Sequence, residues 1–328
     1  MQAETATALL IAAYNAEATI ERAILSALAQ PEVAEVCVID DASSDRTADV
    51  ARACAARDPR VIVRVQAKNA GPAAARNVGL AATRSPWIGI LDADDYLLEG
   101  RIEKVLAHAG EGDFIADALL RVADGAAPER AAAAWRGASR QIGFTEFVLG
   151  NLGQSDGPLD LGFIKPLMRR SFLEAHAIQY RDPMRLGEDY ELYARALAHG
   201  ARLLLTPPAG YVSVEREGSL SKKHSETDLL HLRDCDAELA SIPGLGAQQK
   251  RALARHWTSV DNRLQWRRLI SAVKARDIRA ALATFHTLSA ACFLTARLLE
   301  QAWLRGRALL TRAPSHSNAP AMLPQTRP

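Results

Sequence analysis

The sequence predicts an α/β protein built on a doubly wound mixed sheet flanked by helices, with a mostly helical C-terminal extension. Short apolar runs alternate four times with segments of helical spacing within the first 95 residues. Polar side chains gather just after three of these runs, where the carboxyl ends of the strands would lie. Hydrophobic residues make up 48% of the chain and charged residues 24%, which suits a soluble globular protein with a sizeable core.

The individual elements follow from the same patterns in chain order. Apolar runs predict buried strands at residues 7–13, 35–39, 60–65, 87–91 and 113–117. Apolar residues at helical spacing predict helices at 17–29, 47–57 and 73–82, one that opens at Gly187-Glu188, and later ones at 227–239, 248–273 and 279–310. The Pro/Ser/Asn-rich residues 313–328 are predicted to be disordered.

The run at 87–91 ends in Asp92-Ala93-Asp94-Asp95, three carboxylates within four residues. Like charges this close raise each other's pKa, so such a cluster rarely serves stability. A hard divalent cation removes the conflict and supplies a Lewis acid. The alternative is a solvated acidic turn in which Asp95 caps the next helix.

Two other predicted strands end in polar residues: Tyr14-Asn15 follows the first, and Asp40-Asp41 ends the second. Such strand ends meet at one edge of the sheet, where ligands bind. The first strand is not followed by a Gly-x-Gly-x-x-Gly loop, and the chain has no Walker A sequence. A dinucleotide oxidoreductase and a P-loop ATPase are therefore disfavoured, and a nucleotide would be held by side chains and metal.

The charge of the chain is unevenly distributed. The net charge is +2, but residues 250–328 hold 14 basic against 3 acidic residues, or +11, and the remainder holds 26 against 35, or −9. This asymmetry indicates a basic appendage on an acidic body, with anionic lipid or nucleic acid as partner classes. Nucleic acid is disfavoured because the residues of the inferred cleft are acidic.

The lack of a recognisable targeting signal, together with the spacing of the cysteines, predicts a cytoplasmic protein. The four cysteines show no paired metal spacing, and the N-terminus lacks the basic region of a signal peptide. No stretch is long and apolar enough for a transmembrane helix; the nearest, at 288–304, contains Arg297 and Glu300. If the basic appendage binds lipid, the protein would be peripheral on the inner face of the plasma membrane.

Four motifs in this order resemble glycosyltransferase family 2, the inverting nucleotide-sugar enzymes of the GT-A fold. They are Ala12-Ala13-Tyr14-Asn15, Val38-Ile39-Asp40-Asp41-Ala42-Ser43-Ser44-Asp45, Asn69-Ala70-Gly71-Pro72 with Ala75-Arg76-Asn77-Val78-Gly79, and Leu91-Asp92-Ala93-Asp94-Asp95. Within the family the chain looks most like bacterial exopolysaccharide transferases of succinoglycan type. The resemblance implies a GT-A domain over 1–224 (nucleotide-sugar half 1–110, acceptor half 111–224), a helical basic extension over 225–312 and a tail over 313–328.

The resemblance assigns the first three motifs to the donor. Asp41 would accept a hydrogen bond from the N3–H of uracil in a UDP-sugar, which selects uracil over cytosine. Tyr14 would lie against the base, with Ala12 and Asn15 beside it; alternatively Tyr14 is an ordinary aromatic at a strand end. Arg76 would bind the nucleotide or its diphosphate through its forked donors, unless it is a surface arginine.

The fourth motif, Asp92-Ala93-Asp94, is the DxD motif of this resemblance. Mg²⁺ or Mn²⁺ would bind few protein carboxylates and take its other oxygens from the diphosphate and water. Asp94 is the implied direct ligand, Asp92 would hold the ribose or a metal-bound water, and Ala93 would border the nucleotide-sugar. The closing loop adds Arg216 for the diphosphate and His224 for the metal, although a lone loop histidine is more often simply exposed.

Glu188-Asp189 matches the family's Glu-Asp motif, which carries the catalytic base. Inversion requires one carboxylate to deprotonate the acceptor hydroxyl while the leaving group departs from the opposite face. Asp189 would be that base, and Glu188 would contact the acceptor or orient the loop. The alternative is that both acids only stabilise the start of a helix through its dipole.

These implications describe a metal-dependent inverting transferase. It would move one sugar, glucose by family analogy, from a UDP-sugar to a hydroxyl of a polyprenyl-diphosphate-linked oligosaccharide in exopolysaccharide synthesis. The basic extension would lie on the membrane that holds this acceptor, or would serve packing or dimerisation.

Two rival functions remain at this stage. A sugar-1-phosphate nucleotidyltransferase would need a Gly-rich basic loop after the first strand, where the chain has Tyr14-Asn15-Ala16. A non-catalytic glycan-binding subunit would not need both carboxylate sites. Gln265-Trp266-Arg267-Arg268 differs in order from the Gln-x-x-Arg-Trp of processive synthases, which favours transfer of a single sugar.

Overall fold

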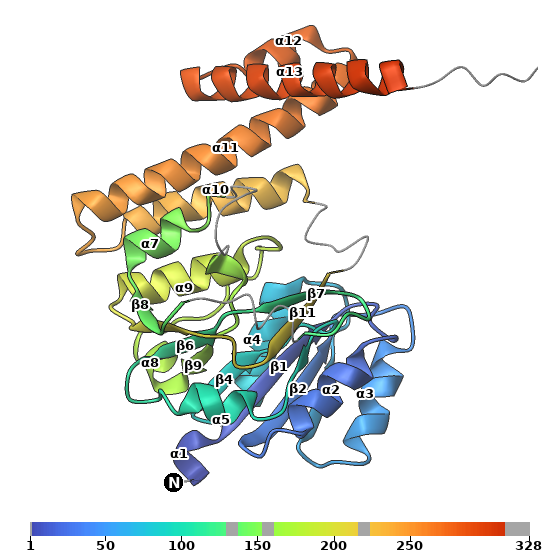
Figure 1. Cartoon of the computed structure of the whole chain (residues 1–328), viewed down its shortest axis with the longest axis vertical. Helices are drawn as coiled ribbons and strands as arrows, with labels where there is room; N and C mark the ends of the chain where they lie inside the picture. Colours follow the sequence, from blue (N-terminus) through green and yellow to red (C-terminus); the bar gives the residue numbers. More distant parts are fainter. Residues whose placement is uncertain (1, 129–136, 153–160, 216–223, 312–328) are drawn as a thin grey trace, which may run out of the picture. The chain divides into compact units, whose positions relative to one another are not determined.

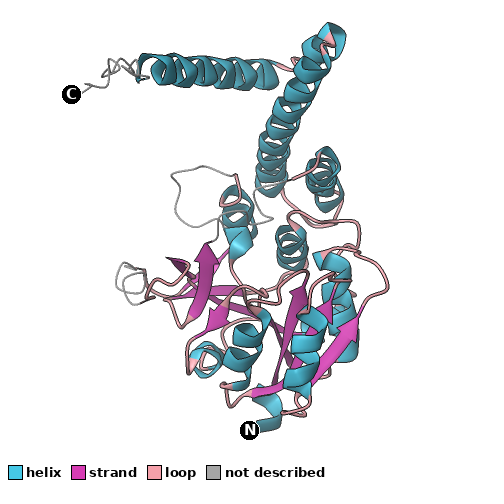
Figure 2. Cartoon of the chain, turned by 90° about the vertical axis from the view of Figure 1, so that its right-hand side faces the viewer, coloured by secondary structure: helices cyan, strands magenta, loops and turns pink. Residues whose placement is uncertain are grey.

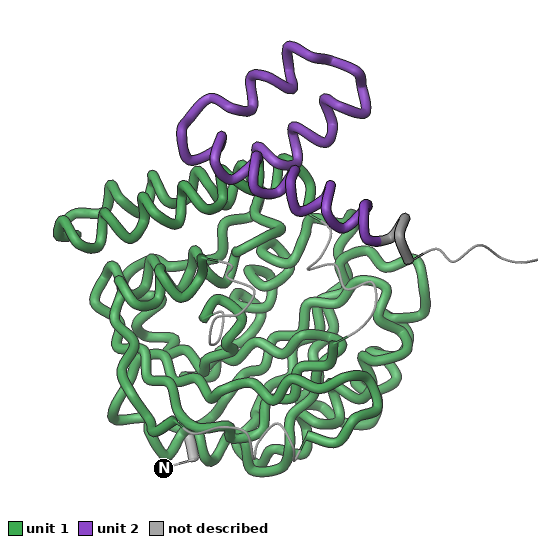
Figure 3. Tube along the Cα trace, turned by 45° about the horizontal axis from the view of Figure 1, so that its top comes forward, with its two compact units in different colours: residues 1–264 green, residues 265–328 purple. Residues whose placement is uncertain are grey.

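A computed structural model describes residues 2–128, 137–152, 161–215 and 224–311. The chain divides into two compact units, Met1–Leu264 and Gln265–Pro328 (Figure 3). The first unit contains the whole α/β domain. The Ala-rich residues 125–137 lie largely outside the described residues, and the predicted disordered tail at 313–328 lies wholly outside them.

The first half of the main sheet has the strands that the sequence predicts. β1 (Thr7–Ala13), β2 (Val33–Asp40), β3 (Val61–Val65) and β4 (Trp87–Ile90) are all parallel. β1 pairs with both β2 and β4, so the ends of these three strands meet at one edge (Figure 1). The short α1 (Gln2–Thr5) precedes them.

Helices cover both faces of this half (Figure 2). α2 (Ile20–Leu28) and α3 (Thr47–Ala55) pack on one face with Leu9 and Ile11, and α4 (Pro72–Ala82) packs on the other with Leu10 and Ile39. Alternate residues of a strand point to opposite faces, so the apolar residues of β1 are buried on both sides of the sheet. The expected doubly wound α/β sheet is confirmed.

The second half makes the sheet mixed. β9 (Leu167–Arg169) runs antiparallel between β4 and β6 (Phe114–Asp117), followed by β10 (Leu203–Thr206) and β8 (Arg140–Ile142) at the edge. Three short strands form a second sheet that the sequence did not predict: β5 (Tyr96–Leu97), β11 (Tyr211–Glu215) and β7 (Leu120–Ala123). They lie beyond the DxD segment and help to hold it, as shown below.

The remaining helices of the first unit follow β4 in the chain. They are α5 (Arg101–Leu106), α7 (Phe144–Leu149), the 3₁₀ turn Leu161–Phe163, α8 (Arg170–Ala175), α9 (Glu188–Ala198) and α10 (Glu226–Ala240). Ser225 and Asp228 form a capping box at the start of α10, which packs against α9. The first compact unit therefore extends past residue 224, where we expected the extension to begin.

The second unit is helical. α11 (Ala247–Ala275) begins in the first unit and ends in the second, followed by α12 (Ile278–Ala283) and α13 (Leu288–Thr311). α12 starts at Asp277, whose side chain accepts a hydrogen bond from the Ala280 N–H. Among the described residues, no helix has the length and apolar character needed to cross a bilayer.

Candidate active site

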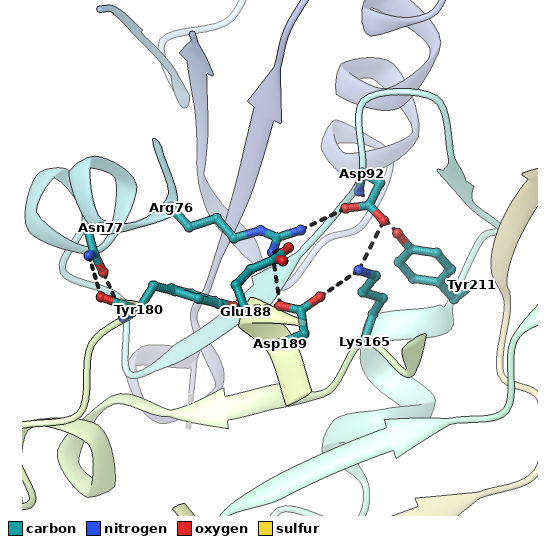
Figure 4. Close-up of polar contacts among 8 residues, drawn as sticks. All are labelled: Arg76, Asn77, Asp92, Lys165, Tyr180, Glu188, Asp189 and Tyr211. Carbon is teal, nitrogen blue, oxygen red and sulfur yellow. Dashed lines mark hydrogen bonds and ion pairs between the residues drawn. The ribbon is translucent and has the colours of Figure 1, made fainter. Parts of the chain in front are cut away.

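A buried arginine joins the two acidic motifs of the chain. Arg76, on α4, donates from Nη2 to Asp92 Oδ1 at 3.1 Å, and from Nη1 to Glu188 Oε1 at 2.6 Å and Asp189 Oδ1 at 3.0 Å (Figure 4). Arg76 is only 4% exposed, so the alternative of a surface arginine is wrong. Burial lowers its pKa, but the carboxylates, Asp189 first, outweigh burial, and the pKa lies well above its ordinary value.

A lysine that sequence reasoning missed provides the second cation. Lys165 Nζ lies 2.8 Å from Asp189 Oδ2 and 3.0 Å from Asp92 Oδ2, and the residue is 5% exposed. Burial opposes its charge, but the two carboxylates raise its pKa above the ordinary value. Lys165 stands in no motif. Only the antiparallel pairing of β9 with β4 brings it beside the DxD segment, and no local pattern reveals that pairing.

Asp189 is held on both oxygens. Besides Arg76 and Lys165, it accepts a hydrogen bond from Tyr180 Oη at 3.1 Å. Asn77, in the motif after Arg76, holds Tyr180 in turn: its Oδ1 accepts from the Tyr180 N–H, and its Nδ2 donates to the Tyr180 carbonyl. The carboxylate thus has a fixed orientation, and one of its roughly four lone-pair positions remains for another donor.

The start of α9 depends on a glycine and on α10. Gly187 precedes Glu188 with φ +71°, a conformation that favours glycine. A Cβ at Gly187 would also lie 2.5 Å from Leu232 Cδ1 on α10. Burial raises the pKa of Glu188 despite the opposing charge of Arg76. α10 therefore helps to place both acids of this motif.

The DxD segment has two carboxylates in distinct surroundings. Asp92 pairs with Arg76 and Lys165, its N–H donates to Tyr211 Oη at 3.1 Å, and its side chain is 35% exposed. Burial raises its pKa, but Lys165 and then Arg76 outweigh this effect, so the pKa is lowered. Asp94 is partly buried, and its carbonyl accepts from Arg22 Nη2. Ala93 between them is buried.

Asp95 does not cap a helix, so the acidic-turn alternative is wrong for this residue. α5 begins at Arg101 with Gly100 as its N-cap. Asp95 is instead buried, and its Oδ1 accepts from the Val214 N–H at 2.9 Å. Burial, followed by the charge of Asp92, raises its pKa to about 7. Its contact fastens the DxD segment to β11.

Asp41 organises the expected base site. Its carboxylate accepts from Gln66 Nε2 at 2.6 Å and from the N–H groups of Ala70 and Gly71, both at 2.8 Å. Three acceptor positions are used, and one remains for a ligand donor. Gly71, with φ +94°, turns the chain into Pro72 at the first position of α4. The Asn-Ala-Gly-Pro motif thus wraps the Asp41 carboxylate.

The first motif lies beside Asp41, because the Asp41 N–H donates to the Ala13 carbonyl at 2.8 Å. Tyr14 is 44% exposed, and Ala12 is partly buried. Asn15 has φ +51°, and its Oδ1 accepts from the Ser44 N–H at 2.8 Å. Asn15 therefore joins two strand-end loops, and Tyr14 is accessible to a ligand.

Two expected ligand residues come from the closing loop. Arg216 lies outside the described residues. His224 stands just before α10, where its charge helps to lower the pKa of Asp228. In the described part of the chain, no three His, Cys, Asp or Glu side chains form a group that could hold a metal ion. A shell of Asp92, Asp94 and His224 together is therefore not assembled, and the ligand role of His224 stays a prediction.

Comparisons with known proteins agree with these motifs. The family model "Glycosyl transferase family 2" matches residues 8–173. The chain is 42% identical to the succinoglycan biosynthesis protein ExoU of Rhizobium meliloti (strain 1021), over 82% of this chain and 79% of that protein. It is 35% identical to ExoO of the same strain, over 84% and 79%.

Solved structures share the fold. S. aureus TarS 1–349 in complex with UDP-GlcNAc matches with a TM-score of 0.61 and 18% identity, over 85% of this chain and 90% of that one. The mannosyltransferase PcManGT of Pyrobaculum calidifontis, in complex with GDP-Man and Mn²⁺, matches with a TM-score of 0.57 and 16% identity, over 93% and 83%. The fold is GT-A, and the chain is a glycosyltransferase that belongs to glycosyltransferase family 2.

Proposed function

We propose that this enzyme is an inverting transferase in exopolysaccharide synthesis. It moves one sugar, glucose, from a UDP-sugar to a hydroxyl of a polyprenyl-diphosphate-linked oligosaccharide at the cytoplasmic face of the membrane. The observation that carries the proposal is the meeting of the DxD and Glu-Asp motifs on Arg76. The guanidinium of Arg76 therefore pairs with donor-side and acceptor-side carboxylates that lie nearly one hundred residues apart in sequence.

The relatives support the finer parts of this proposal. ExoU and ExoO are named for succinoglycan biosynthesis, which is the support for an exopolysaccharide acceptor. The TarS structure contains UDP-GlcNAc, which supports a UDP-sugar donor. The sugar itself rests on the family resemblance.

Asp189 acts as the base in this proposal. Arg76, Lys165 and Tyr180 hold its carboxylate ionised and oriented, and its remaining lone pair would accept the proton of the acceptor hydroxyl. Glu188, on the same helix start, would contact the acceptor. Arg76 would reach the diphosphate with Nε, which is buried and makes no hydrogen bond to the described residues.

The DxD carboxylates fit a hard divalent cation, because carboxylate oxygens are the ligands that Mg²⁺ and Mn²⁺ prefer. Asp94 would bind it directly and Asp92 through water. The Mn²⁺ in the PcManGT structure supports a divalent cation in this enzyme. Such a cation would stabilise the charge that develops on departing UDP. Asp41 and Tyr14 would hold the uracil.

The second unit fits a membrane surface. Residues 265–311 carry 8 basic against 2 acidic residues. Large apolar side chains along α12 and α13 are exposed, including Ile278 (74%), Leu288 (82%), Leu299 (67%) and Trp303 (59%). Exposed apolar side chains among arginines are typical of helices that lie in the interface of anionic bilayers.

The test measures transfer and donor binding separately. The enzyme is incubated with a panel of UDP-sugars, Mn²⁺ and a lipid-linked acceptor extract, and UDP release and glycolipid product are quantified. Asp189→Asn should lower turnover by about 10² to 10⁴-fold while UDP affinity in Mn²⁺ changes little. Asp49→Asn, on the exposed surface of α3, is the control. Full turnover in Asp189→Asn would remove the base assignment, and UDP binding without any turnover in wild type would favour a glycan-binding subunit.

A further inference from the structure

Lys165 lies where the donor and acceptor halves of the site meet. It stands just before β9, which pairs antiparallel with β4, so it lies beside the carboxyl end of β4 that carries Asp92. The register places Leu167 opposite Gly89, and a Cβ at Gly89 would lie 2.9 Å from Leu167 Cδ2. The glycine therefore leaves room beside β4 for the side chain of Leu167, two residues after Lys165.

A buried ion pair, Arg101 with Asp117, helps to hold the backbone at Lys165 and at Asp92. Arg101 donates from Nη2 to the Lys165 carbonyl at 2.8 Å and pairs with Asp117, and both side chains are almost fully buried. Asp117 Oδ2 also accepts from the N–H of Tyr211. Tyr211 Oη accepts in turn from the Asp92 N–H. One rigid network therefore supports the Lys165 and Asp92 backbones together.

The ammonium group of Lys165 bridges Asp92 and Asp189. An ammonium has three N–H donors, and two of them suit the carboxylate oxygens at 3.0 and 2.8 Å. In the described part of the chain, Arg76 and Lys165 both link these carboxylates, and they do so through different oxygens. Arg76 also holds Glu188, whereas the Nζ of Lys165, among the described residues, pairs with the DxD aspartate and with the base.

We propose that Lys165 is a positioning residue that fixes the base Asp189 relative to the donor-side Asp92, and so acts on turnover rather than on donor binding. The inference rests on the proposed function, because it takes Asp189 as the base. Misplacing a base by about 1 Å costs a factor of roughly 10² in rate, since the reacting atoms leave the near-attack geometry. Loss of the bridge should therefore lower kcat and leave the KM for the donor almost unchanged.

The experiment uses the full-length chain and four variants. Lys165→Met removes the charge and keeps the length, and Lys165→Ala leaves a cavity that n-propylammonium fits. Lys104→Met removes an exposed lysine of α5 as the matched control, and Asp189→Asn reports on the base. We measure kcat, the KM for UDP-glucose (or for the UDP-sugar that proves active), and the Kd for UDP in Mn²⁺ by calorimetry, after checking the melting temperature.

We expect Lys165→Met to lower kcat about 30-fold to 1000-fold, with KM and Kd within about threefold of wild type. n-Propylammonium should raise kcat of Lys165→Ala several-fold, whereas 1-propanol, which has the same shape without charge, should not. If Lys165→Met does not fold, Lys165→Arg replaces it, and its kcat should fall between wild type and Lys165→Ala.

Two results would overturn the proposal. Near-wild-type kcat in a folded Lys165 variant would show that the bridge does not position the base. A Kd for UDP at least tenfold weaker, with kcat unchanged, would make Lys165 a donor ligand instead. Asp189→Asn separates this failure from that of the proposed function: if Asp189→Asn is inactive while Lys165→Met is active, only the role of Lys165 is wrong.

Discussion

Removal of Arg76 should expose how strongly the two acidic motifs depend on a shared cation. Wild type places Arg76 and Lys165 among the carboxylates of Asp92, Glu188 and Asp189, a local net charge of −1. Arg76→Met makes that charge −2. The side chains of Glu188 and Asp189 are only 12% and 8% exposed, so water cannot solvate the unpaired charge.

The burial of these carboxylates sets how much Arg76→Met lowers the free energy of unfolding. Leaving a buried ion without its partner costs about 3–5 kcal/mol, and the Asp92 pair adds little because that side chain is 35% exposed. We therefore expect Arg76→Met to lower the free energy of unfolding by about 3–4 kcal/mol. The double variant Arg76→Met/Glu188→Gln restores a local charge of −1, so it should regain at least about 1 kcal/mol. It should not regain activity.

The assay is urea unfolding of the full chain, with the slope of the free energy against urea compared between variants. Arg52→Met is the control, because Arg52 is an exposed arginine paired with Asp49 and should change stability by less than about 0.5 kcal/mol. A loss below about 1 kcal/mol for Arg76→Met would refute the reasoning. A double variant no more stable than the single one would show that charge balance is not the cause.

Three further predictions follow from the same structure. Gly187→Ala should lower stability by about 1–2 kcal/mol from the positive φ alone, and more from its contact with Leu232, and should lower kcat because α9 begins there; a melting curve and initial rates check both. A thiol reagent at pH 7.5 should modify one cysteine per native chain, the exposed Cys292, and all four in urea; burial raises the pKa of Cys37 to about 11 and also raises those of Cys54 and Cys235. Trp303→Glu should weaken cosedimentation with anionic vesicles several-fold without changing UDP affinity; equal sedimentation would contradict membrane contact through Trp303.

The first 91 residues were predictable from sequence because their signals are local. The expected strands and helices of residues 7–91 agree with the structure to within about three residues at each end, since each is a short apolar run or a clear helical repeat. Asp41, Asp92 and Asp189 each stand in a short motif that can be recognised in the sequence without a structure. Parallel strands then bring the strand-end motifs to one edge, so the convergence of Asp41 and Asp92 followed from topology.

The missed features depend on long-range pairing. Lys165 has no motif, and its role arises because β9 inserts antiparallel between β4 and β6. The second sheet escaped prediction because its strands have two to five residues. Arg76 was expected at the diphosphate, yet no local pattern shows that its guanidinium lies between two acidic motifs separated by more than 90 residues. Side-chain partners across such distances are set by the fold.

The charge balance of the site also bears on the proposed donor. The diphosphate of a UDP-sugar brings about two negative charges into a cluster that is already negative, and Asp94 adds another carboxylate nearby. Arg76 and Lys165 offset this charge only in part, because the Nη groups of Arg76 and the Nζ of Lys165 are engaged with Asp92, Glu188 and Asp189, which leaves the Nε of Arg76 for the diphosphate. Releasing either cation to the diphosphate would leave a buried carboxylate unpaired. A donor that arrives with its own divalent cation avoids this conflict, so the arrangement of cations within the protein is itself a physical reason for the proposed metal dependence.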